Sequence, residues 1–198
     1  MATEKEKIPA QLPYYALDEE LSQERLAAQK ACFRINSISP ELAEECNEIL
    51  KELLGSTKEN FYIEPPFHCD YGHNISLGDN FYSNYNPIIL DCAEVSIGDN
   101  VMLVPNVSIF TAGHPVHAKK RNEGLEYSIP VTIGNNIWIG GNTVINPGIN
   151  IRDNTVIGSG SVLTRDIPSN VIAAGNPCKV IKEITGNDKN YYFKKRRF

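Results

Sequence analysis

The sequence predicts a mainly β protein, a parallel β-helix that follows an N-terminal helical segment and is interrupted by one long loop. The first observation is a period of six: aliphatic residues recur at every sixth position over residues 133–163. The second is that this period stops over residues 111–130 and then resumes. The third is that amphipathic helical patterns occur only before residue 55. Since a helix repeats every 3.6 residues and a strand every two, a period of six indicates a short strand and a corner, repeated around a prism.

The hexads predict which residues fill the prism and which turn its corners. The core positions are Ile133, Ile139, Ile145, Ile151, Ile157 and Leu163, preceded at the same interval by Leu77, Ser83 and Ile89 and by Ile97, Leu103 and Ile109, with a two-residue slip around Cys92-Ala93-Glu94. Glycine follows the aliphatic residue at Gly78, Gly98, Gly134, Gly140 and Gly158, and the hexad often ends in Asn80, Asn100, Asn106, Asn136, Asn142, Asn154 or Asp166. We expect glycine and asparagine to accept the unusual dihedral angles of the corners.

The N-terminal segment predicts two amphipathic helices. Asp18 is a suitable cap for the first helix, whose apolar positions include Leu21, Leu26, Ala27 and Phe33. Ser39 and Pro40 favour the start of a second helix, and Gly55 is expected to end it. One face of this helix carries the apolar residues Leu42, Cys46, Ile49, Leu50 and Leu53. The predicted organisation is therefore a helical segment over residues 1–60, the β-helix over 61–184 with its inserted loop, and a basic C-terminal tail over 185–198.

Composition excludes several classes of protein. The chain has 198 residues and a net charge of −5, which disfavours a nucleic-acid binder. No apolar run approaches the length of a membrane span, and the N-terminus lacks the apolar core of a signal peptide. The five cysteines are scattered and form no C-x-x-C pair, which favours free thiols in a reducing compartment. We therefore expect a cytoplasmic protein that binds neither nucleic acid nor membrane.

The loop 111–130 carries His114 and His117, two of the four histidines. Loops on a rigid scaffold are where chemistry usually lies, and histidine is the side chain best suited to act as a base near neutral pH. From these residues alone, His114 is equally consistent with a base and with a turn contact before Pro115. The proline between the two histidines disfavours a helix that would align them on a metal ion, so His117 is predicted to be an exposed loop residue or an acceptor contact.

Five stretches carry a more specific resemblance, over nearly the whole chain: IEPPFHCDYGHNISLGDNFYSNYN (63–86), ILDCAEVSIGDNVMLVPNVSI (89–109), TAGHPVH (111–117), PVTIGNNIWIGGNTVINPG (130–148) and AAGNPCKVIKEI (173–184). They resemble the hexapeptide-repeat acyltransferases, and most closely the maltose, galactoside and nodulation O-acetyltransferases, with maltose O-acetyltransferase nearest. The resemblance implies a left-handed β-helix with three strands per coil. It also implies acetyl transfer from acetyl-CoA to a hydroxyl of a sugar such as maltose, glucose or a galactoside, homotrimers with active sites between subunits, and no metal.

The resemblance also implies roles for individual residues. His114 is the general base of a direct transfer and Asn84 stabilises the developing oxyanion. The matching acceptor-side positions are Arg25, Asp70 and Tyr82. By residue type alone, Asp91 is a candidate to accept hydrogen bonds from sugar hydroxyls, and Glu126 is consistent with orienting His114, with binding the acceptor and with a solvated loop carboxylate. Galactoside enzymes carry a second acidic residue after the position of Asp91, where this chain has Cys92, and this difference favours a maltose-type acceptor.

The expected coenzyme A site is an elongated groove with cations at its phosphate end. By the same resemblance, Trp138 lies beside the cofactor, Gly141, Ser159 and Thr164 line the pantetheine channel, and Arg165, Lys179 and Lys182 lie at the phosphate end. The family often has arginine at the last two positions, and lysine keeps the charge without bidentate geometry.

Three alternatives remain open from the sequence. A γ-carbonic anhydrase would require three histidines on zinc, for which His68, His73 and His114 are the candidates. A non-catalytic trimeric binding or scaffold protein would use the same prism. Serine and antibiotic acetyltransferases also share this fold and base, so the fold alone does not determine the acceptor.

Overall fold

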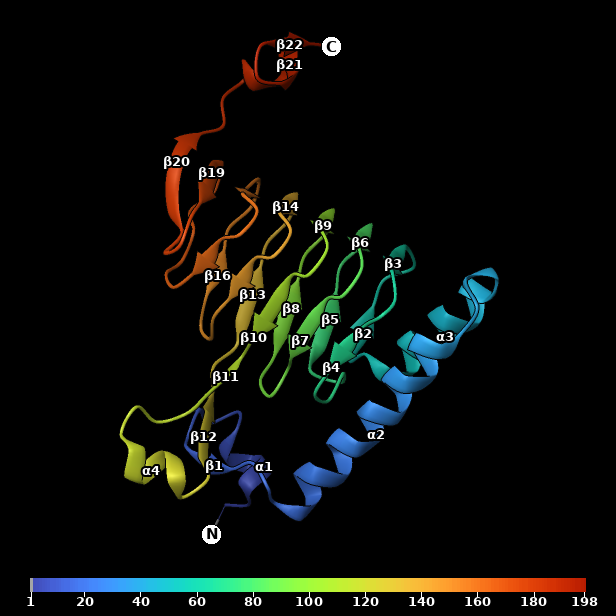
Figure 1. Ribbon diagram of the computed structural model, residues 1–198, viewed down its shortest axis with the longest axis vertical. Coiled ribbons are helices and arrows are strands. Elements are labelled where there is room, and N and C mark those ends of the chain that lie inside the picture. The colour runs from blue at the N-terminus through green and yellow to red at the C-terminus, as the bar shows by residue number, and fades with distance from the viewer. Residues whose placement is uncertain (1) are drawn as a thin grey trace.

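The computed structural model describes residues 2–198 and confirms the predicted fold class, a left-handed parallel β-helix with a helical N-terminal segment and one inserted loop (Figure 1). The prism has three faces, which we number in chain order. Face one contains β2 (Ser56–Thr57), β5 (Ile75–Leu77), β8 (Val95–Ile97), β13 (Val131–Ile133) and β16 (Asn150–Ile151). Face two contains β3 (Phe61–Ile63), β6 (Phe81–Ser83), β9 (Val101–Leu103), β14 (Ile137–Ile139), β17 (Val156–Ile157), β19 (Val171–Ala174) and β20 (Lys179–Glu183). Face three contains β4 (His68–Cys69), β7 (Ile88–Leu90), β10 (Ser108–Phe110), β15 (Val144–Ile145) and β18 (Val162–Leu163).

The core follows the hexads. Every aliphatic residue predicted at a core position is buried, and so is the one polar core residue, Ser83, whose hydroxyl donates to the Asn84 carbonyl oxygen at 3.1 Å. Equivalent residues of successive coils pair in parallel register, for example Ile97 with Ile133 and Ile133 with Ile151. Each coil is therefore covered by its neighbours, and the core is continuous along the prism.

The corners depend on asparagine and glycine for different reasons. The hexad-ending asparagines have positive φ, as at Asn100 (56°) and Asn136 (57°), and their amides form a ladder in which Asn100 Nδ2 donates to Asn136 Oδ1 at 3.2 Å. The hexad glycines do not have positive φ, so the prediction that they accept unusual dihedral angles is wrong. They are required by close packing instead: a Cβ on Gly78 would lie 2.4 Å from the carbonyl carbon of Gly98 in the next coil.

The N-terminal segment contains α1 (Glu4–Lys7), β1 (Tyr14–Tyr15), α2 (Glu19–Ser37), a 3₁₀ turn (η1, Pro40–Leu42) and α3 (Ala43–Leu53). Asp18 caps α2 as predicted, by accepting from the amides of Glu20 and Leu21. The predicted buried face of α2 is wrong in part: Leu26 and Phe33 are 42% and 74% exposed. The helix buries a stripe of Leu21, Ala28, Cys32 and Ile35 instead, and α3 buries Cys46, Ile49 and Leu50 of its predicted face, whereas Leu42 is exposed.

The inserted loop lies between β10 and β13, as predicted, and is itself folded. It contains β11 (Ala112–Gly113), α4 (Ala118–Asn122) and β12 (Leu125–Ser128). With β1 from the N-terminal segment it forms a small antiparallel sheet in the order β1-β12-β11, which projects from the prism (Figure 1).

The C-terminal tail holds a second 3₁₀ turn (η2, Asp188–Asn190) and a hairpin of β21 (Tyr191–Phe193) and β22 (Arg196–Arg197). In Figure 1 this hairpin lies beyond the prism, at the end that carries β19 and β20. All five cysteines are buried free thiols, as predicted. None of the helices in residues 2–198 combines the length and apolar character that crossing a bilayer requires.

Candidate active site

The candidate residues fall on two different edges of the prism. Connections from face three to face one include residues 70–74, 91–94, 111–130 and 164–166, and we call this the insertion edge. Connections from face two to face three include residues 84–87, 140–143 and 158–161, and we call this the Asn84 edge. In Figure 1 the insertion projects from one side of the prism, while β3, β6, β9 and β14 end on the other side. One copy of the chain therefore does not bring His114 and Asn84 together.

His114 lies on the insertion edge, directly after β11, and its ring is held in one orientation. Its Nδ1 is 3.1 Å from the carbonyl oxygen of Leu125 in β12. Because a carbonyl oxygen only accepts, Nδ1 carries the proton of the neutral ring, and Nε2 presents a lone pair. The side chain is 54% exposed, so Nε2 is open to a substrate hydroxyl. This is the tautomer that a general base requires.

Glu126 lies beside the same ring. Its Oε2 is 4.0 Å from His114 Nε2, and its side chain is only 12% exposed. Its other oxygen, Oε1, accepts from the hydroxyl of Tyr14 at 2.5 Å. Tyr14 is completely buried, and burial, followed by the nearby Cys92 thiol, raises the pKa of its phenol above the usual 10.0. Neither Tyr14 nor the Leu125 carbonyl group lies in a recognisable sequence motif, so neither was predicted to belong to the site.

The acceptor-side residues on the insertion edge are linked through Tyr71 and Cys92. Arg25 donates to the Tyr71 hydroxyl at 2.6 Å and to the carbonyl oxygen of Ala16, so α2 is joined to the prism here. The Cys92 thiol donates to Asp70 Oδ2 at 3.3 Å. Burial raises the pKa of the Asp70 carboxyl from its usual 3.8, and the Cys92 hydrogen bond opposes that shift.

Asp91 has no exposed surface, which contradicts the expectation that it accepts hydrogen bonds from a sugar. Its Oδ1 accepts from the backbone amides of Asp70 and Tyr71 at 3.0 and 2.9 Å. Its Oδ2 is buried and has no hydrogen-bond partner in residues 2–198. Burial raises the pKa of the Asp91 carboxyl. The structure thus assigns Asp91 to shaping the 70–74 turn rather than to contacting an acceptor.

Asn84 and Tyr82 lie together at the Asn84 edge. Asn84 Nδ2 donates to the Tyr82 hydroxyl oxygen at 3.2 Å, and Asn84 Oδ1 accepts from the Tyr85 amide at 2.8 Å. The Tyr82 ring stacks on Tyr62 with centroids 5.9 Å apart. The Asn84 amide plane is therefore fixed, and one of its N–H groups has no acceptor within residues 2–198.

The predicted coenzyme A residues divide between the same two edges. Gly141 and Ser159 lie on the Asn84 edge, and Trp138, 52% exposed, lies on the adjoining face two in register with Met102. Thr164 and Arg165 lie on the insertion edge, where Thr164 lines a hollow of about 460 Å³ with the root of the insertion. Gly141 has little room for a side chain, because a Cβ would lie 3.0 Å from the Pro105 carbonyl oxygen.

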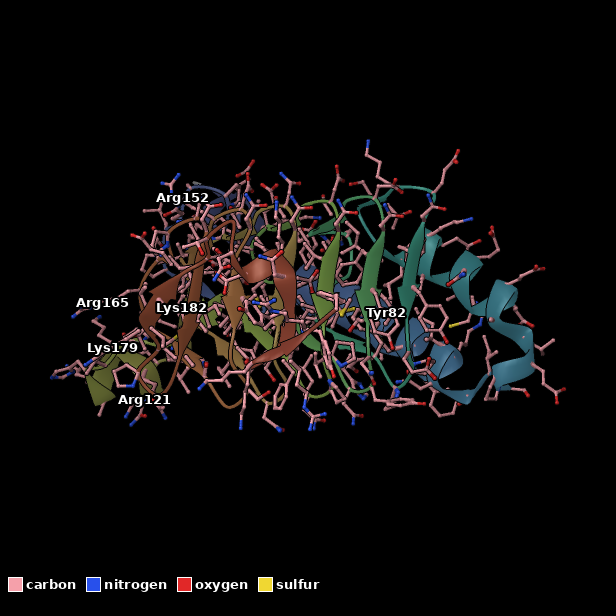
Figure 2. The ribbon with its side chains drawn as sticks, turned by 90° about the horizontal axis from the view of Figure 1, so that it is seen from above. Tyr82, Arg121, Arg152, Arg165, Lys179 and Lys182 are labelled. Atoms are coloured by element: carbon pink, nitrogen blue, oxygen red, sulfur yellow. The ribbon has the colours of Figure 1, made fainter. Side chains whose placement is uncertain are left out.

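Two lysines of β20 were predicted at the phosphate end. Figure 2 shows Arg165, Lys179 and Lys182 at the β19–β20 end of the molecule, far from Tyr82. Lys182 is engaged in an ion pair with Asp188 at 2.5 Å, and this pair lowers the pKa of Asp188 to about 2. Lys182 is thus engaged in an ion pair, whereas Arg165 and Lys179 are predicted cations that have none within residues 2–198.

The histidines do not gather into a metal site within one copy. In residues 2–198 no group of three or more His, Cys, Asp or Glu side chains is placed to hold an ion. His68 is exposed on β4, and His73 packs edge-on against Tyr71 with ring centroids 5.7 Å apart. The three-histidine site that a carbonic anhydrase requires has no counterpart in the described chain.

Known proteins match this chain over nearly its full length. Residues 7–58 match the family described as "Maltose acetyltransferase hexapeptide capping motif", and residues 130–165 match "Bacterial transferase hexapeptide (six repeats)". The chain is 48% identical to the galactoside O-acetyltransferase of Escherichia coli K12 over 189 residues, which covers 96% of this chain and 93% of that protein.

Two solved structures have the same fold. One is a galactoside acetyltransferase in complex with coenzyme A, with a TM-score of 0.97, 45% identity, and coverage of 100% of this chain and 99% of that one. The other is a maltose O-acetyltransferase from Clostridium difficile 630, with a TM-score of 0.92, 50% identity, and coverage of 93% and 98%. Fold and site thus define an acetyltransferase of the hexapeptide-repeat class. Within that class, the chain belongs to the family of maltose and galactoside O-acetyltransferases.

Proposed function

We propose that this chain transfers an acetyl group from acetyl-CoA directly to a hydroxyl of a sugar, with His114 as the general base. The observation that carries the proposal is the fixed tautomer of His114, whose Nδ1 faces the Leu125 carbonyl oxygen at 3.1 Å and whose Nε2 is open. A free hydroxyl is a weak nucleophile at neutral pH, so its proton must be removed as it attacks the thioester.

The proton balance of the step follows from this geometry. His114 Nε2 accepts the hydroxyl proton as the sugar oxygen bonds to the acetyl carbon. Asn84 donates to the oxyanion of the tetrahedral intermediate. The carbon–sulfur bond then breaks, and the imidazolium returns its proton to the departing thiolate. The five cysteines are buried, which disfavours an acetyl-cysteine intermediate.

We propose that the working site forms between copies of the chain in a homotrimer. Support comes from the placement of His114 and Asn84 on different edges, so that an insertion edge and an Asn84 edge must face each other across a subunit contact. Face two also presents a row of exposed large side chains, Tyr62, Met102 and Trp138, of the kind that subunit contacts cover. Coenzyme A would lie along this contact, between Trp138 on one side and Thr164 and Arg165 on the other, with Lys179 near its phosphates.

For the acceptor we propose a glucosyl sugar, as in maltose, in preference to a galactoside. Support comes from Cys92, whose thiol donates to Asp70 and cannot accept hydrogen bonds from a sugar as a carboxylate would. In this proposal Arg25 and Asp70 line the acceptor side from the insertion edge, and Tyr82 lines it from the Asn84 edge. Both named relatives, a galactoside and a maltose enzyme, are consistent with a sugar acceptor.

The test is a thiol-release assay with acetyl-CoA against glucose, maltose, galactosides, serine and chloramphenicol. We expect turnover with a glucosyl sugar, and a loss of about 10²- to 10⁴-fold in His114→Ala. His117→Ala is the matched control, because His117 is exposed in the same insertion. Near-normal turnover in His114→Ala would overturn the assignment of the base. Bound coenzyme A without turnover on any acceptor would favour the scaffold alternative.

A further inference from the structure

We propose that Tyr14 is a positioning residue for catalysis, which holds Glu126 against His114 and so makes the N-terminal segment part of the active site. The inference rests on the proposed role of His114 as the base. It concerns a residue outside the hexapeptide repeats, from a strand of only two residues.

The register of the small sheet places Tyr14 beside the residues that contact His114. Strand β1 pairs with β12 so that Tyr14 lies opposite Glu126 and Tyr15 lies opposite Leu125. These two residues of β12 are the ones that contact the His114 ring, one through its carbonyl oxygen and the other through its carboxylate. The short strand β1 thus pairs with β12, the strand that orients the proposed base.

A hydrogen bond from Tyr14 orients the Glu126 carboxylate. The Tyr14 hydroxyl donates to Glu126 Oε1 at 2.5 Å, and the carboxylate then directs Oε2 toward His114 Nε2 at 4.0 Å. A separation of 4.0 Å is too long for a hydrogen bond, and it leaves Nε2 free for the substrate hydroxyl. The carboxylate is nevertheless close enough to stabilise the imidazolium that forms when Nε2 accepts a proton. Within residues 2–198, the Tyr14 hydroxyl is the one side-chain group that donates a hydrogen bond to the Glu126 carboxylate. Removing that hydroxyl therefore leaves the orientation of Glu126 unfixed.

The packing around Tyr14 fixes the position of its ring. Its ring belongs to a small buried cluster with Leu21, Tyr71 and Cys92, separate from the core of the prism. Cys92 in turn donates to Asp70, so the acceptor-side carboxylate and the base are joined through Tyr14. The titratable groups that face Glu126 are therefore Tyr14 from β1, His114 from the end of β11, and Cys92 and Asp70 from the prism.

The experiment compares kcat and KM for acetyl transfer in Tyr14→Phe and Tyr15→Phe. Tyr14→Phe keeps the ring in its buried cluster and removes only the hydroxyl. Tyr15→Phe is the matched control, because the Tyr15 side chain is 46% exposed and makes no hydrogen bond in residues 2–198. We expect Tyr14→Phe to lower kcat about fivefold, equivalent to losing about 1 kcal/mol of interaction between charges 4 Å apart. We expect KM to stay unchanged, since the oriented carboxylate acts on the imidazolium that forms during transfer and not on substrate binding.

Glu126→Gln and the double variant complete the test. Glu126→Gln should lower kcat by a similar factor, because it removes the charge beside the imidazolium. Adding Tyr14→Phe to Glu126→Gln should then have little further effect, because the hydroxyl acts through the carboxylate. Tyr14→Phe with unchanged kcat would overturn this inference while leaving His114 as the base. Full turnover in His114→Ala would instead overturn the proposed function itself. A fold defect, shown by a lowered Tm in Tyr14→Phe, is distinguished because its effect would add to that of Glu126→Gln.

Discussion

Two edges of the prism each turn the chain from one face to the next, but they use their side chains in opposite ways. One is the corner between faces one and two, and the other is the insertion edge. At the first corner, which we call the asparagine edge, Asn80, Asn100, Asn136, Asn154 and Asn170 stack in a single ladder with amide contacts of 3.0 to 3.2 Å. At the insertion edge the connections range from the short turn 91–94 to the folded loop 111–130, and their side chains include the buried Asp91 carboxyl and the buried Cys92 thiol. Regular turns stabilise the stack, whereas the irregular edge holds the proposed base.

If this comparison is right, the largest loss of stability should come from the regular edge. Gly78→Ala places a Cβ 2.4 Å from the carbonyl carbon of Gly98, and the backbone of the next coil cannot move away without disturbing the stack. We expect a loss of about 3 kcal/mol in the free energy of unfolding, measured by urea denaturation. Gly186→Ala in the tail is the control, because no atom lies within 4 Å of its added Cβ. Equal stability of the two variants would contradict the close-packing account.

A smaller loss is expected from the ladder. Asn136→Ala keeps the φ of 57° but replaces a residue that tolerates it, and it removes amide contacts to Asn100 and Asn154. We expect the free energy of unfolding to fall by roughly 2 kcal/mol, most of which comes from the left-handed conformation. Asn136→Gly should recover most of that loss, because glycine adopts this conformation freely. If glycine is as destabilising as alanine, the amide ladder rather than the backbone conformation is the main contribution.

The smallest effect is expected at the insertion edge and depends on pH. Asp91 has a folded-state pKa raised by burial, so its folded form binds the proton more tightly than its unfolded form. Its contribution to stability is therefore greatest below the ordinary pKa of 3.8 and declines as the pH rises through the folded-state value. Asp91→Asn keeps an oxygen for the Asp70 and Tyr71 amides and removes the buried charge. We expect its Tm to rise relative to the wild type as the pH is raised from acid to neutral. A constant difference across that range would show that the buried carboxyl does not titrate differently on folding.

The regular part of the fold could be predicted from the sequence, because each hexad repeats one physical requirement. Residues such as Ile133 and Ile151 are buried as their spacing predicts, and the insertion begins and ends where the period does. The glycine positions were also predicted, although for the wrong reason. Glycine is required there because neighbouring coils approach each other closely, and the sequence of one hexad does not show how close the next coil lies. The exposed Phe33 shows a similar limit: the helical pattern allowed two faces, and only the packed prism selected one.

The site was predicted less completely, because it depends on contacts between distant segments. His114 was identified through its motif, but the Leu125 carbonyl group that fixes its tautomer and the Tyr14 hydroxyl that holds Glu126 lie in segments without periodicity. The burial of Asp91 and the ion pair of Lys182 depend on where the 70–74 turn and the tail fold back. Neither position could be read from local sequence.

The central claim is that one working site combines the insertion edge of one copy with the Asn84 edge of another. The most direct test is to co-express His114→Ala and Asn84→Ala chains and to assay acetyl transfer by the mixed oligomers, beside each variant alone. If the two residues come from different copies, about a quarter of the contacts in a randomly mixed cyclic trimer carry both intact residues, and about a quarter of wild-type activity should return. If both residues act within one chain, no mixture contains an intact site, and activity would remain at the level of the single variants.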